Sequence, residues 1–85
     1  MKHAGPEALS AVEELLAEIR GYQGLVERRT GVFYLKGRAF LHFHEDPSGL
    51  HADMRPGAAW ERLRVETRAE RQALLSRLGE ALSKG

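Results

Sequence analysis

Three of the four histidines in this 85-residue chain, His42, His44 and His51, lie within ten residues of one another, and Asp53 follows closely. They form a His-x-His pair and a His-x-Asp pair. Residues two apart in a β-strand lie on the same face of a sheet, so each pair presents both side chains to one side. Neutral imidazoles and a carboxylate are ligands that suit zinc, nickel or iron. These four residues are therefore the candidate metal ligands.

The pairs belong to a predicted β-hairpin. Its strands cover residues 38–44 and 50–55, and the turn cluster Asp46-Pro47-Ser48-Gly49 separates them. A four-residue loop places His44 opposite His51 and His42 opposite Asp53 on one face. The other face is apolar, with Phe43 opposite Ala52, Leu41 opposite Met54, and Leu50 beside them. A slip of one residue would mix the two sets, so the pattern selects this pairing or another of the same parity.

The same histidines allow two further interpretations. One is a polar sheet face with an Asp53–His42 hydrogen bond and no ligand. The other is catalytic, with His42 oriented by Asp53 as the base of a catalytic triad. Ser48 lies in the turn, the other serines lie on predicted helices, and no serine-elbow, phosphate-loop or H-E-x-x-H motif occurs. The sequence therefore favours a non-enzymatic role over a hydrolase.

Three arginines accompany the histidines. Arg55, Arg62 and Arg64 are expected to share their face, with Trp60 near its edge. Arginine and aromatic side chains on a sheet can bind a nucleic acid. However, Asp53 shares the face, and the net charge is only +1, whereas nucleic-acid-binding surfaces are usually strongly basic. We therefore expect no nucleic-acid partner, and we include the three arginines among the candidate ligand-binding residues.

Length and composition predict one small domain that spans residues 1–85. The chain has no cysteine, which excludes disulfides and thiolate metal sites. Its longest apolar runs have four residues, so no membrane span is expected. The start, Met-Lys-His-Ala-Gly-Pro, lacks the apolar stretch of a secretory signal, which predicts a cytoplasmic location. No cofactor is expected apart from zinc or nickel at the histidines.

The sequence also predicts a bacterial source. Ten of the thirteen basic residues are arginine, and asparagine is absent, a usage typical of GC-rich genomes and compatible with a thermophile. The stretch FLHFHEDPxGLxAD at residues 40–53 resembles a motif in small uncharacterised bacterial proteins of about this length. The resemblance extends through residues 62–67 into the last helix. No activity is attached to that family, so the resemblance implies no catalytic residues.

A first helix is expected to begin at Pro6 and to end at Arg29-Thr30-Gly31. Gly21 and Gly24 weaken its last turns, so a bend is expected near Gly21. Apolar residues recur at helical spacing on one side: Leu9, Val12, Leu16, Ile19 and Val26, widened by Leu15 and Tyr22.

A second helix has a clearer start. Thr67-Arg68-Ala69-Glu70 matches the capping box, in which the threonine hydroxyl and the glutamate carboxylate satisfy each other's backbone amides. Its apolar side consists of Leu74, Leu75, Leu78 and Leu82. Both helices are expected to pack on the apolar face of the sheet.

Two further strands are expected, over residues 32–35 and 61–66. Lys36-Gly37 predicts a tight turn between residues 32–35 and the strand that starts at Arg38, because glycine readily adopts a positive φ. With the hairpin described above, the chain would contain four strands.

The register of the first hairpin remains open and has a consequence for assembly. A two-residue loop puts Val32 and Tyr34 on the core face, whereas a three-residue loop puts Phe33 and Leu35 there. Either register leaves about three apolar side chains, Phe40 among them, on the face away from the helices. A large exposed apolar patch is unusual for a monomer. The sequence thus predicts a homodimer through that face or through a free edge strand.

These elements predict an α+β fold of two layers, α-β-β-β-β-α, in which a four-stranded antiparallel meander carries both helices on one face. This order resembles frataxin-like and secretion-chaperone-like domains, which use the other sheet face for partners; the resemblance concerns the fold alone. The expected function is a small non-enzymatic cytoplasmic binding or protein-interaction module. The alternative is a metal- or small-ligand-binding domain that uses the His/Asp face.

Overall fold

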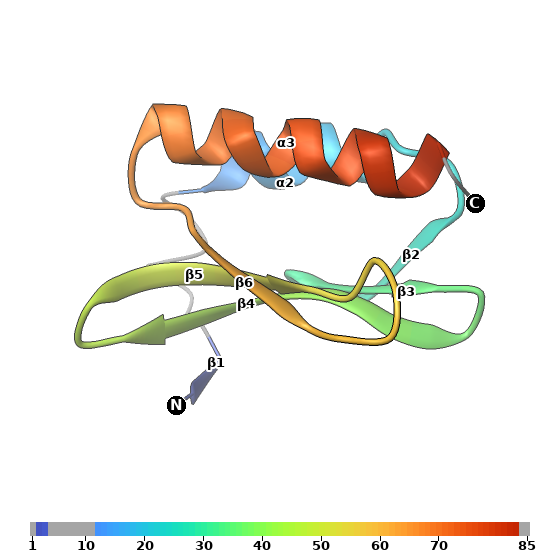
Figure 1. The fold of residues 1–85 in the computed structure, drawn as a ribbon, viewed down its shortest axis with the longest axis horizontal. Helices are drawn as coiled ribbons and strands as arrows, with labels where there is room; N and C mark the ends of the chain where they lie inside the picture. The colour runs from blue at the N-terminus through green and yellow to red at the C-terminus, as the bar shows by residue number, and fades with distance from the viewer. Residues whose placement is uncertain (1, 4–11, 84–85) are drawn as a thin grey trace.

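The computed structural model describes residues 2–3 and 12–83 of the chain (Figure 1). The elements in chain order are β1 (Lys2–His3), α2 (Glu13–Arg20), β2 (Leu25–Arg29), β3 (Val32–Leu35), β4 (Arg38–Asp46), β5 (Gly49–Met54), β6 (Glu61–Arg64) and α3 (Arg68–Ser83). The predicted α+β class and the antiparallel sheet are confirmed.

The sheet contains five consecutive strands in the order β2-β3-β4-β5-β6, and every neighbouring pair is antiparallel. The prediction of a four-stranded meander is therefore wrong by one strand. The short β1 stands outside this order and pairs with β4, where Lys2 lies opposite Glu45 and His3 opposite His44.

The additional strand, β2, occupies residues that the sequence assigned to the first helix. α2 ends at Arg20, and Gly24, which directly precedes β2, adopts a φ of 93° that a continuing helix could not contain. Thr30-Gly31 is the turn between β2 and β3, with a φ of 78° at Gly31, instead of the end of a helix. Val26 thus lies on an edge strand, opposite Tyr34. The predicted helix start at Pro6 lies outside the described part of the chain.

The first hairpin combines both predicted registers. Lys36 and Gly37 form a two-residue turn with φ values of 53° and 80°, and Tyr34 lies opposite Ala39. The register then shifts, so that Phe33 lies opposite Leu41. A β-bulge at Phe40 produces this shift, because two residues on β4 then oppose one on β3. Phe33 consequently faces the core, although the loop has two residues.

Phe40 itself joins the hydrophobic core and is only 4% exposed. The expectation that it stands on the face away from the helices is wrong. The reason is the bulge, which interrupts the alternation of side chains along β4 at this residue.

The second hairpin has the predicted register. Four residue pairs confirm it: Leu41 with Met54, His42 with Asp53, Phe43 with Ala52, and His44 with His51. Asp46 also pairs with Gly49, so the loop itself is shorter than expected and consists of Pro47 and Ser48. Each side chain still lies on its predicted face, because the two strands only extend by the pair Asp46 and Gly49 next to the turn.

The core lies between the sheet and the helices. Figure 1 shows α3 running along one side of the sheet, with α2 behind it. Buried apolar residues come from both helices and from the inner strands: Leu15, Leu16 and Ile19 of α2, Phe33 of β3, Leu41 and Phe43 of β4, Ala52 and Met54 of β5, and Leu74 and Leu78 of α3. Neither of the two helices in residues 12–83 is long and apolar enough to cross a membrane.

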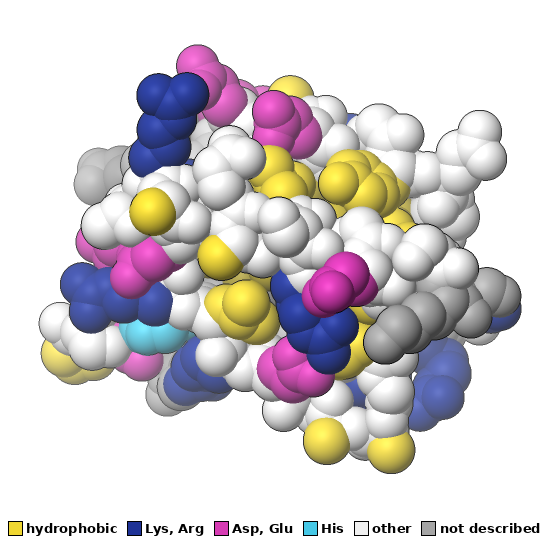
Figure 2. Space-filling model, turned by 45° about the horizontal axis from the view of Figure 1, so that its top comes forward, with side chains coloured by type: hydrophobic (Ala, Val, Ile, Leu, Met, Phe, Trp, Pro, Cys, Tyr) yellow, Lys and Arg dark blue, Asp and Glu magenta, His cyan; other side chains and the backbone are white. Residues whose placement is uncertain are grey.

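The helix side of the surface is mixed in character. Figure 2 brings this side forward and shows hydrophobic side chains as separate patches among Lys, Arg, Asp and Glu side chains. Some of these charged side chains form ion pairs, such as Arg77 of α3 with Glu61 of β6 at 2.8 Å. Such pairs help to hold α3 against the edge of the sheet.

The capping box at the start of α3 is confirmed. The backbone N–H of Glu70 donates to the Thr67 hydroxyl at 3.1 Å, and the Thr67 N–H donates to the Glu70 carboxylate at 2.9 Å. The same carboxylate accepts the N–H of Glu66 at 2.9 Å. These bonds satisfy backbone groups that a helix start otherwise leaves without partners.

Thr67→Ala should therefore lower the free energy of unfolding by about 0.5–2 kcal/mol, because one end amide of α3 loses its acceptor. Denaturant unfolding monitored by circular dichroism measures the difference. Thr67→Ser keeps the hydroxyl and should lose much less. Equal unfolding midpoints for the wild type and Thr67→Ala would contradict the cap.

A second local network links α2 to the β2–β3 turn. The Glu27 carboxylate accepts hydrogen bonds from Nε of Arg20 at 2.6 Å and from the N–H of Gly31 at 3.0 Å. The Arg20 hydrogen bond lowers the pKa of Glu27; burial opposes this, and the Gly31 N–H adds to the lowering.

A folded-state pKa below the ordinary value of 4.5 stabilises the protein above that pH. The contribution is lost as the pH falls through the lower folded value. Glu27→Gln should therefore reduce the melting temperature near neutral pH, and its difference from the wild type should shrink below about pH 4.5. Arg20→Gln should show the same pattern, because it removes the partner. A difference that stays constant from neutral pH to pH 3 would rule out this linkage.

Candidate functional site

The candidate site lies on the sheet face away from the core, which we call the polar face. It carries His42 and His44 of β4, His51 and Asp53 of β5, and Arg62 and Arg64 of β6. Side chains alternate between the two faces of a strand, so the core residues Leu41, Phe43 and Ala52 place their neighbours on the polar face. The sequence predicted this separation correctly for residues 41–44 of β4 and for residues 50–54 of β5.

Two rows of opposed residues cross the polar face. The first row is His42, Asp53 and Arg62, and the second is His44, His51 and Arg64. Opposed side chains of an antiparallel pair have Cβ atoms about 4.5–5.5 Å apart. The rows therefore bring ionisable groups from three strands into contact distance.

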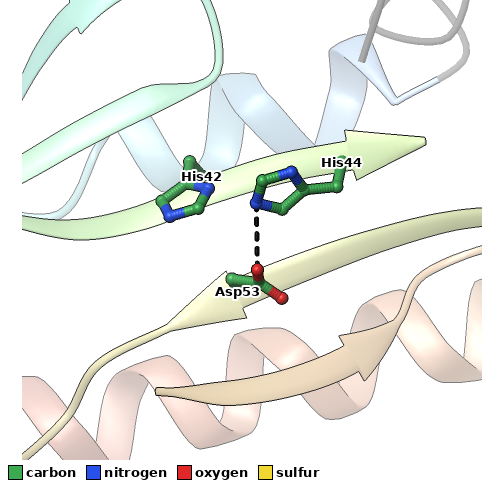
Figure 3. Close-up of side chains that lie close together, drawn as sticks. All are labelled: His42, His44 and Asp53. Atoms are coloured by element: carbon green, nitrogen blue, oxygen red, sulfur yellow. Dashed lines mark ion pairs between the residues drawn. The ribbon is translucent and has the colours of Figure 1, made fainter. Parts of the chain in front are cut away.

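His42, His44 and Asp53 form the tightest group (Figure 3). Each offers one ligand atom, and these atoms all lie within 4.8 Å of one another. The two imidazole ring centroids are 4.4 Å apart, and Nε2 of His44 lies 2.9 Å from Oδ2 of Asp53. Figure 3 shows the two imidazoles on β4 and the carboxylate on the neighbouring strand, gathered at one place.

Asp53 is the centre of this group and is tightly held. Nε of Arg62 donates to Oδ1 at 2.8 Å, and Nη2 donates to Oδ2 at 3.0 Å, a bidentate pair. Burial is the largest influence on the pKa of Asp53 and by itself would raise it. The Arg62 hydrogen bonds and the charges of His44, Arg62 and His42 outweigh burial and hold the pKa below its ordinary value. Asp53 is therefore an anion at neutral pH.

The group is largely shielded from water. His44, His51 and Asp53 are each only 9% exposed. The Arg62 side chain, on the edge strand, is 39% exposed. A carboxylate that is buried this far costs free energy unless it is paired, and Arg62 and His44 supply the pairing.

His51 does not join this group, although the sequence grouped all three histidines. It contacts the hairpin turn, with Nδ1 3.8 Å from Oδ1 of Asp46 and Nε2 3.5 Å from Oγ of Ser48. His51 lies on the same strand as Asp53, two residues nearer the turn, and its ring contacts the turn residues. The structure therefore offers three metal-ligand candidates in one group: His42, His44 and Asp53.

Ser48, His51 and Asp46 have the residue types of a catalytic triad, but their geometry differs. In a triad, the serine and the aspartate lie at opposite ends of the imidazole. Here the Ser48 hydroxyl donates directly to Oδ1 of Asp46 at 2.6 Å. The Ser48 N–H donates to the same oxygen at 2.9 Å, which is an ordinary turn interaction. The serine proton is thus directed to the carboxylate instead of to a general base.

The other arginines have separate partners. The Arg55 guanidinium lies 4.8 Å from the Trp60 ring and donates to the carbonyl of Ala39 at 2.7 Å. The Trp60 ring in turn lies 4.7 Å from that of His42. Arg64 pairs loosely with Glu70 of the capping box at 3.7 Å. Of the three arginines predicted for the site, only Arg62 contacts the Asp53 group directly through hydrogen bonds.

Two features of the site were missed by sequence analysis. The first is the bidentate contact of Arg62 with Asp53. It could have been found by pairing β5 with β6 in the sequence, because Arg62 then lies opposite Asp53. The second is β1, whose backbone places His3 opposite His44. A two-residue strand carries no sequence pattern of its own, so this second feature had no usable signal.

Comparison of the chain with family models, curated proteins and solved structures gives no match. The site must therefore be interpreted from its own geometry and chemistry.

Proposed function

We propose that the protein is a small non-enzymatic binding module, and that the polar face around His42, His44 and Asp53 is its ligand site. The helices would cover one face of a two-layer domain and leave the other face for the ligand. The observation that carries the proposal is the gathering of three ionisable side chains, with Asp53 only 9% exposed, on a sheet face that the core does not use.

The proposal is supported by the free-energy cost of burying ionisable side chains. Taking a charged pair out of water usually costs as much as the pair regains, so a buried pair is rarely kept for stability alone. Ionisable groups with altered surroundings cluster at functional sites for the same reason. The apolar core, from Leu16 of α2 to Leu78 of α3, is built without any member of the group.

The contacts favour binding over catalysis or nucleic-acid recognition. Ser48, which lies beside His51, donates its hydroxyl hydrogen bond to Asp46 and not to that histidine. Arg62 is neutralised by Asp53, and Arg64 lies beside Glu70. These pairings leave little uncompensated positive charge for a phosphate backbone. The cytoplasmic location expected from the sequence remains part of this proposal.

We also propose a homodimer, now through a different patch from the one expected around Phe40. Val26 is 57% exposed and lies opposite Tyr34, and Val32 occupies the same face of β3. β2 is an edge strand, so its outer backbone groups are available to a second copy. A second copy would cover the exposed Val26 together with its half-buried neighbours Val32 and Tyr34.

If the polar group serves a ligand, replacing it with apolar residues should not harm the fold. The triple variant His44→Leu, Asp53→Leu, Arg62→Met should keep or raise the free energy of unfolding, by up to about 4 kcal/mol. Denaturant unfolding measures this without knowledge of the ligand. Arg77→Met with Glu61→Leu removes an ion pair outside the polar face and should change stability by at most about 1 kcal/mol. A loss of more than about 2 kcal/mol in the triple variant would show that the group is structural.

Light scattering at tens of micromolar should give about twice the chain mass of 9.5 kDa. Val26→Glu should produce a monomer, because it puts a charge into the shared apolar patch. Gln23→Glu adds the same charge at an exposed turn and should leave the dimer intact. A wild-type monomer that binds no dye for hydrophobic surfaces would refute the dimer.

A further inference from the structure

We propose that His42, His44 and Asp53 bind one divalent transition-metal ion of the zinc and nickel class, and that Arg62 occupies the carboxylate until the ion replaces it. This inference rests on the proposed binding function, because it names the ligand of the same polar face.

The ligand set defines the class of ion. Two imidazoles and one carboxylate suit zinc, nickel and cobalt, whereas calcium and magnesium prefer sites made of oxygen alone. Three protein ligands also leave a coordination position open for water or a small anion. His42 and His44 come from one strand and Asp53 from the next, so the sheet fixes the backbone of all three.

The distances require only side-chain movement. Tetrahedral zinc with bonds of 2.0–2.1 Å needs ligand atoms about 3.3 Å apart. The three ligand atoms lie within 4.8 Å of one another, so the widest separation must close by up to about 1.5 Å. Rotation about side-chain torsions achieves this, while a change of register is unnecessary.

Arg62 is the direct competitor of the ion. Its two hydrogen bonds use both oxygens of Asp53, at 2.8 and 3.0 Å. An ion that binds Asp53 would compete with the Arg62 guanidinium for the negative charge of this carboxylate. Arg62 stands on the edge strand β6 with a side chain that is 39% exposed, so its guanidinium can turn into water when it is displaced. Removing Arg62 should therefore strengthen metal binding at this site. Nonspecific binding of metal to other histidines should not depend on Arg62.

Trp60 supplies a local readout. It is the only tryptophan of the chain, and its ring lies 4.7 Å from that of His42. Nickel bound at His42 would lie close enough to quench the indole fluorescence. Quenching therefore reports this site and not ions bound elsewhere on the surface.

Two control residues follow from the contacts. His51 contacts Asp46 and Ser48 and lies outside the ligand group, so His51→Gln removes a histidine without removing a ligand. Arg64 lies on the same strand as Arg62 but pairs with Glu70, so Arg64→Gln is the matched control for the lost charge. His3 is unsuitable as a control, because its backbone lies opposite His44.

The experiment titrates nickel chloride and zinc chloride into tag-free protein near neutral pH, with Trp60 fluorescence and calorimetry as readouts. We expect saturable binding of one ion per chain. Asp53→Asn should weaken it by about tenfold or more, and Arg62→Gln should tighten it by about tenfold. His51→Gln and Arg64→Gln should stay within about threefold of the wild type. If Asp53→Asn does not fold, as shown by circular dichroism, His42→Gln replaces it and should give the same loss.

The outcomes separate the two proposals. Absence of quenching and heat in both the wild type and Arg62→Gln would overturn the metal site, as would an equal loss in His51→Gln. Unchanged affinity in Arg62→Gln would overturn its role as competitor. If metal binding fails but the apolar triple variant remains stable, the polar face still serves another ligand. If that triple variant is strongly destabilised, the binding function fails as well.

Discussion

The pairing of β4 with β5 is the constraint on which the rest of the structure depends. Phe43 lies opposite Ala52, and His44 lies opposite His51. Because side chains alternate with a period of two, this one register sends Leu41, Phe43, Leu50, Ala52 and Met54 to the core, and His42, His44, His51 and Asp53 to the polar face. A shift by one residue would expose Phe43 and bury His44 against the helices. The core and the candidate site are thus consequences of the same pairing.

Asp53 links the three strands that carry the polar face. It lies on a strand with neighbours on both sides, so a charge placed there loses most of its contact with water. The loss must be compensated from the adjacent strands, and it is: Arg62 contributes from β6 and His44 from β4. The three strands are therefore linked by side chains on this face as well as by backbone hydrogen bonds.

Local signals in the sequence predicted the parts of the fold that depend on neighbouring residues. The second hairpin and the Thr67–Glu70 cap are both such cases, since turn chemistry and short-range pairing decide them. The failures concern β2 and the bulge in β4. Val26 of β2 continues the helical spacing of apolar residues, yet the segment is an edge strand against β3, between Gly24 and Gly31, which both have a positive φ. The bulge at Phe40 places this side chain in the core, and the alternation of residues along the strand does not reveal it.

The same distinction applies to the candidate site. The alternation of residues predicted that His42, His44, His51 and Asp53 share a face, but not which of them meet. The His51 ring contacts Asp46 and Ser48 at the turn, whereas His42 and His44 lie near Asp53. Arg62 completes the group only because β6 pairs with β5 in one register. An arginine that satisfies the carboxylate without a ligand keeps the fold stable before binding, at the expense of affinity. Such a site would suit the reversible binding proposed above, since Asp53 would have a partner whether or not the ligand is present.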